Sequence, residues 1–110
     1  MGEASADRAD EDCPPAHVPE GALVRELRIV NRKGLHARAS AKFVQTVERY
    51  DSDVTVTRCG ETVGGRSIMG LLTLGAAQGT TIPVTAKGED AEACLDALAG
   101  LLAGRFGEEE

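Results

Sequence analysis

His36 is the residue of this sequence whose surroundings best suit phosphoryl chemistry. It follows a basic, glycine-containing segment at residues 31–34 and stands where a helical pattern begins, with Arg38 two residues later. The first turn of a helix has backbone N–H groups without partners and the positive end of the helix dipole, so it stabilises an anion. An imidazole nitrogen can attack phosphorus and hold the group as a labile phosphoramidate. The pattern suits a phosphoryl acceptor, but a lone histidine at a helix start is more often a cap or a surface residue, so the residues alone favour that second interpretation.

The formal net charge of −6 is unevenly distributed along the 110 residues. Most of it lies in the first 23 residues, where Arg8 is the only arginine or lysine. The remainder is nearly balanced and lacks the basic surplus of a nucleic-acid binder. Local positive charge gathers around His36, at Arg32, Lys33, Arg38 and Lys42. This cluster suits a phosphorylated ligand or an acidic partner, and a solvated patch is the alternative.

The length fits one domain, preceded by a segment of different composition. Residues 1–22 are dominated by Ala, Asp, Glu and Pro, which predicts a disordered acidic leader. No apolar run approaches a membrane span, and no secretory signal is recognised. Three cysteines without C-x-x-C spacing argue against a disulfide framework and favour the cytoplasm. No metal-ligand spacing is found, so no metal is expected.

Hydrophobic periodicity predicts seven elements between residues 23 and 104. Alternation predicts strands at 23–30, 54–57, 62–63 and 80–87, and helical spacing predicts helices at 37–50, from 67 and from 90. We expect Phe43, Tyr50 and Cys94 in the core. The order predicts an α+β two-layer open-faced sandwich with helices on one face of an antiparallel sheet. Residues 105–110 are expected to fray as an acidic tail.

The second helix begins at Ser67, a good N-cap residue. Leu71 and Leu74 can face the core, so the remaining apolar residues exceed what helix packing needs. We therefore expect an exposed docking patch beside His36, formed by Ile68, Met69 and Leu72.

Two separate motifs resemble HPr, the histidine phosphocarrier family of the phosphoenolpyruvate-dependent phosphotransferase system (PTS). Residues 34–38 read Gly-Leu-His-Ala-Arg and residues 66–70 read Arg-Ser-Ile-Met-Gly, followed by Gly79-Thr80 and Gly-Glu-Asp at 88–90. The resemblance runs from about residue 24 to about residue 102. It implies four strands in the order 1-4-2-3, which would put Pro83 in a central strand where proline is disfavoured. Ala39 stands where most members have proline, which loosens the helix start slightly and adds one N–H.

The resemblance implies a monomeric carrier and not an enzyme, with neither cofactor nor metal. His36 would accept a phosphoryl group from enzyme I and pass it to enzyme IIA proteins, with Arg38 and the helix-start N–H groups balancing the charge. Ser67 aligns with the serine that many members present to HPr kinase/phosphorylase. The residues expected to dock partners are Arg32, Lys33, Ala39, Ile68, Met69 and Leu72.

Two other functions remain open from the sequence. One is a regulatory adaptor, acting through Ser67 or in the nitrogen-related branch of the PTS, with no role in sugar transport. The other is a small module that binds a free phosphometabolite, which would require a deep pocket with converging polar residues.

Overall fold

The computed structural model describes residues 18–109. Most of the predicted leader, residues 1–17, therefore lies outside the described residues. The strands in this range are β1 (Leu23–Arg28), β2 (Asp53–Arg58), β3 (Glu61–Gly64) and β4 (Thr81–Lys87). The helices are α2 (Ala37–Val47), α3 (Ile68–Thr73) and α4 (Ala91–Ala103), and a short 3₁₀ segment, η2 (Arg105–Gly107), follows. No helix in this range has the length and apolar character needed to cross a bilayer.

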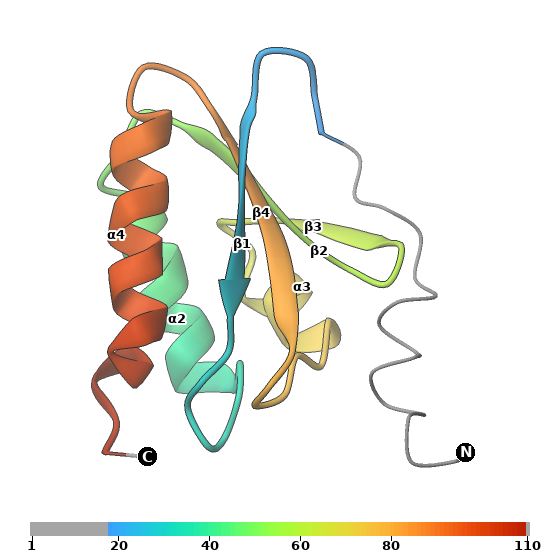
Figure 1. Cartoon of the computed structure of the whole chain (residues 1–110), viewed down its shortest axis with the longest axis vertical. Helices are drawn as coiled ribbons and strands as arrows, with labels where there is room; N and C mark the ends of the chain where they lie inside the picture. The colour runs from blue at the N-terminus through green and yellow to red at the C-terminus, as the bar shows by residue number, and fades with distance from the viewer. Residues whose placement is uncertain (1–17, 110) are drawn as a thin grey trace.

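The four strands form one antiparallel sheet in the order β1-β4-β2-β3 (Figure 1), which confirms the predicted fold class. β2 and β3 are joined by the two-residue turn Cys59-Gly60, where both residues have positive φ (49° and 83°). Positive φ at both positions gives the turn that matches the natural twist of a hairpin. Glycine accommodates this conformation easily, which explains why the hairpin turns at this point.

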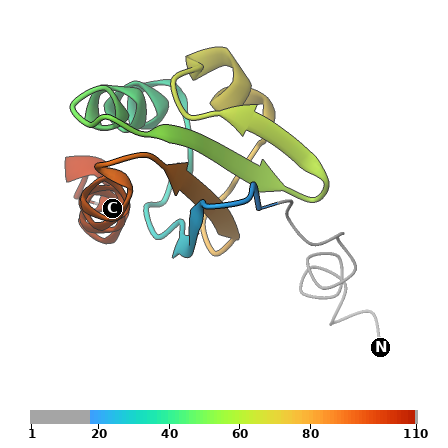
Figure 2. The same cartoon turned by 90° about the horizontal axis from the view of Figure 1, so that it is seen from above.

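The helices and the sheet enclose a single hydrophobic core. Leu27, Val56 and Val84 alternate with exposed or polar neighbours along their strands and are buried. Helices α2 and α4 lie side by side, and α3 contacts α2 (Figures 1 and 2). The core also contains Phe43 of α2 and Cys94 of α4, as predicted, whereas Tyr50 is only partly buried against it. Burial raises the pKa of the Cys94 thiol, because the thiolate would lose its hydration.

Pro83 is accommodated in the central strand β4 because one of its two ladders ends beside it. The pairing of β4 with β2 stops at Val84, whereas the pairing with β1 continues and places Glu26 opposite Pro83. The Thr80 carbonyl accepts the N–H of Ile29, so alternate residues of β4 from Thr80 onward bond to β1. The nitrogen of Pro83 therefore faces the β2 side, just beyond the last pair of that ladder, so its missing N–H interrupts neither the β1 ladder nor the four pairs between β4 and β2.

The C-terminal tail does not fray, contrary to the sequence-based expectation. Residues 105–109 turn back after α4, and the Phe106 side chain is only 1% exposed in the core. The Lys42 ammonium of α2 donates to the Phe106 carbonyl. The expectation failed because one aromatic residue in a polar segment has no periodic pattern. Glu110 lies outside the described residues.

Candidate functional site

The loop before α2 is fixed by a buried asparagine and a close backbone contact. Asn31 is fully buried, and its Nδ2 donates to the Gly34 carbonyl at 2.8 Å. Gly34 has a φ of +70°, and a Cβ atom there would lie 2.6 Å from the carbonyl oxygen of Ala76. The Leu35 N–H donates to that same oxygen at 2.9 Å. The loop is therefore held firmly against the segment that follows α3, and it places His36 at the start of α2.

His36 lies at the start of α2, as the sequence predicted, and it is the N-cap of this helix. Its backbone is extended (φ −82°, ψ −175°), and its Nδ1 accepts the N–H of Arg38 at 3.3 Å. The same capping geometry is usually supplied by serine, threonine, aspartate or asparagine. Because an N–H group donates to Nδ1, this nitrogen carries a lone pair, and the proton of the neutral ring is on Nε2. The available lone pair therefore points at the N-terminus of the helix.

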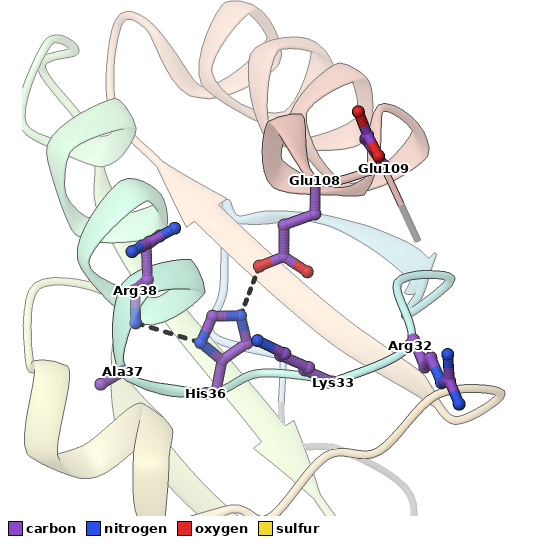
Figure 3. A pocket seen from close by; sticks show the side chains of 7 residues that line it. All are labelled: Arg32, Lys33, His36, Ala37, Arg38, Glu108 and Glu109. Carbon is purple, nitrogen blue, oxygen red and sulfur yellow. Dashed lines mark hydrogen bonds and ion pairs between the residues drawn. The ribbon is translucent and has the colours of Figure 1, made fainter.

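The other ring nitrogen contacts a carboxylate that the sequence analysis missed. Nε2 of His36 is hydrogen-bonded to Oε2 of Glu108 (Figure 3). Oε1 of Glu108 accepts from Nδ2 of Asn31 at 3.0 Å. The Asn31 hydrogen bond, with His36 and the nearby Lys33 charge, holds the pKa of the Glu108 carboxyl below its usual value. Glu108 follows His36 by 72 residues, so no local motif could have revealed the pair.

A surface pocket of about 590 Å³ opens beside the imidazole (Figure 3), and its lining residues are Arg32, Lys33, His36, Ala37, Arg38, Glu108 and Glu109. Lys33 extends toward the His36 ring, whereas Arg32 points to the other side of the loop. The guanidinium of Arg38 is exposed and has no hydrogen-bond or ion-pair partner within residues 18–109. It can therefore pair with an anion that enters the pocket without breaking an existing contact.

This arrangement suits the transient binding of a phosphoryl group. The hydrogen bond from Arg38 N–H to Nδ1 is long, at 3.3 Å, so the lone pair is released at little cost. A phosphoryl group on Nδ1 would meet the same N–H and the positive end of the helix. Within the described residues, no group of three His, Cys, Asp or Glu side chains could hold a metal ion.

The structure exposes some of the residues expected to dock partners and buries others. Met69 is 71% exposed and Ile68 40% exposed, as predicted for a docking patch. Leu72 is half-buried and contributes less. The prediction for Ala39 is wrong, because its side chain is fully buried in the core. It lies on the inner face of α2, so only its backbone N–H belongs to the helix start.

Ser67 lies at the start of α3, where its Oγ accepts the N–H of Gly70 at 3.0 Å. This confirms its predicted role as an N-cap. The residue is exposed, so the hydroxyl that caps the helix is also accessible from solvent.

Comparisons with known proteins identify related phosphocarriers. A family model described as the PTS HPr component phosphorylation site matches residues 23–104. Phosphocarrier protein HPr of Neisseria meningitidis is 47% identical over 88 residues, which are 80% of this chain and 99% of that protein. Phosphocarrier protein NPr of Shewanella violacea is 37% identical over 86 residues, which are 78% of this chain and 94% of that protein. The crystal structure of HPr-C-His from Thermoanaerobacter tengcongensis is 39% identical, with a TM-score of 0.76, and covers 80% of this chain and 99% of its own.

Proposed function

Because this chain belongs to the HPr family of PTS phosphocarriers, we propose that Nδ1 of His36 is the atom that carries the phosphoryl group. The supporting observation is the capping geometry. Nδ1 accepts the Arg38 N–H, so its lone pair is unprotonated and directed at the helix N-terminus. The protein is a carrier and not an enzyme: it is a substrate in two successive transfers.

The first transfer moves the phosphoryl group from phosphorylated enzyme I to His36. The Nδ1 lone pair forms the N–P bond while the bond from phosphorus to the donor breaks, and that electron pair remains with enzyme I. The helix-start N–H groups and the free Arg38 guanidinium then balance the charge on the phosphoryl oxygens. The second transfer reverses these roles toward an enzyme IIA protein, and both require in-line approach of the reacting groups.

Partner proteins dock on the surface around the pocket. Arg32 and Lys33 are exposed on the loop before His36, and Ile68 and Met69 are exposed on α3. This combination of positive charge and exposed apolar area suits a partner with an acidic rim and an apolar centre. The carrier acts as a cytoplasmic monomer in this scheme.

Ser67 is a second modification site in this proposal, and it would be phosphorylated by an HPr kinase/phosphorylase. Its hydroxyl is accessible, and it stands next to the exposed Ile68 and Met69. A phosphate adds a charge of roughly −2 at neutral pH. Placed inside the docking surface, this charge would weaken the binding of an acidic partner.

The alternative is a regulatory adaptor in the nitrogen-related branch of the PTS, without a role in sugar transport. The 37% identity to an NPr protein supports this alternative, whereas the 47% identity to the HPr protein described above supports the first assignment. The two assignments share the chemistry of His36 and differ in the acceptor. Phosphoryl transfer from the loaded carrier to sugar-specific and to nitrogen-related enzyme IIA proteins distinguishes them by rate.

The carrier function is tested with phosphoenolpyruvate, purified enzyme I and intact-mass measurement before and after mild acid. The matched variant is His36→Asn, because asparagine can still cap α2 but cannot form a phosphoramidate. We expect one acid-labile phosphoryl group on the wild type and none on the variant. No gain of mass on the wild type, with enzyme I shown to phosphorylate itself, would overturn the proposal.

A further inference from the structure

The segment after α4 has an unusual backbone that is held in place by a buried side chain. Arg105, Phe106 and Gly107 have positive φ values of 59°, 55° and 80°. A residue with a side chain adopts this left-handed conformation only at a cost in free energy. Burial of the Phe106 side chain, which is only 1% exposed, offsets this cost. The path of the tail is therefore set by its own residues.

Glycine is favoured at the last position of this turn, where φ is again positive. Gly107 has a φ of +80°, and a Cβ atom there would lie 3.2 Å from Nζ of Lys42. Lys42 in turn donates to the Phe106 carbonyl. After Gly107 the backbone becomes extended at Glu108 (φ −84°, ψ 154°). The tail thus leaves its buried anchor with Glu108 directly over the loop that carries His36.

The two carboxylates that line the pocket differ in their contacts with the His36 ring. Glu108 reaches Nε2 of His36 with one oxygen and Nδ2 of the buried Asn31 with the other. Glu109, the next residue, lines the same pocket but points away from the ring (Figure 3). From this geometry we infer that Glu108 is a positioning residue for phosphoryl transfer through His36, an inference that rests on the proposed function.

Glu108 acts on the nucleophile through the far side of the ring. By accepting the Nε2 proton in a hydrogen bond, it favours the tautomer in which Nδ1 has a free lone pair. When Nδ1 forms the N–P bond, it donates its lone pair and the ring becomes more positive, while Nε2 keeps its proton. The adjacent carboxylate stabilises this positive charge, as the aspartate of a catalytic triad stabilises its imidazolium. Asn31 holds the carboxylate in place.

The experiment compares wild type, Glu108→Ala, Glu108→Gln and Glu109→Ala as acceptors from phosphorylated enzyme I. We expect Glu108→Ala to lower the maximal transfer rate about tenfold, the effect of one lost charge-assisted hydrogen bond. The KM for enzyme I should change less than twofold, because the ring and not the docking surface is affected. Glu108→Gln should give an intermediate rate, since its amide oxygen can accept the proton but carries no charge. Glu109→Ala removes a pocket carboxylate that does not reach the ring, so it should not lower the maximal transfer rate.

Proton NMR supplies a readout that a merely structural role would not move. The Nε2 proton of His36 should give a slowly exchanging imidazole signal in the wild type and in Glu109→Ala, and this signal should disappear in Glu108→Ala. The inference is overturned if Glu108→Ala and Glu109→Ala have equal transfer rates, or if the imidazole signal survives in both. A wild type that accepts no phosphoryl group would instead reject the proposed function, so the two failures are distinguishable.

Discussion

The carboxylate of Glu108 is hydrogen-bonded to Nε2 of His36, a residue 72 positions earlier in the chain. Nδ1 of the same ring accepts the N–H of Arg38. The two ring nitrogens therefore have different environments. Nε2 is hydrogen-bonded to a carboxylate, and Nδ1 faces the helix start, where an anion is stabilised. In the proposed function, this division makes the N-cap histidine a directed nucleophile.

Removing the Arg38 side chain should slow phosphoryl transfer without displacing His36. The cap uses the backbone N–H of Arg38, which Arg38→Ala retains. We expect the rate to fall about 10- to 100-fold, the value of one or two hydrogen bonds to a charged group. Arg38→Lys should lie between, because lysine keeps the charge but not the planar fork. Rapid-quench measurement of phosphoryl exchange with enzyme I gives this transfer rate. An unchanged rate in Arg38→Ala would show that the Arg38 side chain does not assist the transfer.

A negative charge at Ser67 should weaken exchange with enzyme I. Asparagine and aspartate can both replace the cap that Ser67 gives the Gly70 N–H, so Ser67→Asn and Ser67→Asp differ mainly in charge. Like charges at an interface are costly, and we expect Ser67→Asp to raise the KM for an acidic enzyme I about tenfold, with Ser67→Asn close to the wild type. Equal KM values for the two variants would contradict the docking model.

The Glu108 contact should make the folded state sensitive to acid. The Asn31 hydrogen bond, followed by contributions from His36 and Lys33, lowers the pKa of Glu108 below its usual 4.5. The stabilisation is therefore fully present above about pH 4.5 and is lost as the pH falls through the lower folded-state pKa. The difference in unfolding free energy between wild type and Glu108→Gln should shrink as the pH is lowered from about 6 to about 3. Urea denaturation at several pH values measures it, and a constant difference would refute the prediction.

Phe106 should contribute to global stability although it lies beyond the last long helix. Its side chain is 1% exposed, and truncation of such a residue costs about 3–5 kcal/mol. Alanine keeps the backbone cost of the left-handed conformation but lacks the buried ring, so we expect Phe106→Ala to lose about 3–5 kcal/mol in urea denaturation. A loss below about 1 kcal/mol would mean that the tail frays after all.

The elements and the place of His36 at a helix start could be predicted from sequence because their signals are local. Alternating strands, helical stripes and a histidine before a helical pattern each fall within a few residues of one another. The exposure of Ile68 and Met69 also followed from the surplus of apolar residues on a short helix.

The tail could not be predicted because its contacts are remote in sequence. Phe106 packs into the core but belongs to no helical or alternating pattern of apolar residues. Glu108 contacts His36 only after the whole chain has folded. Ala39 was placed on the docking surface by its position in the motif, but 100° per residue around α2 turns its side chain inward. Pro83 fits a central strand because a ladder ends at Val84, which depends on register and not on composition.

The most direct test of the central claim is to locate the phosphoryl group by long-range ¹H–¹⁵N correlation spectra of the phosphorylated, ¹⁵N-labelled protein. We predict that the phosphoryl group is on Nδ1 of His36 and that Nε2 retains its proton. A phosphoryl group on Nε2 would contradict this account. So would a phosphoryl group on Ser67, or on His17, the other histidine of the sequence, after the same reaction with enzyme I.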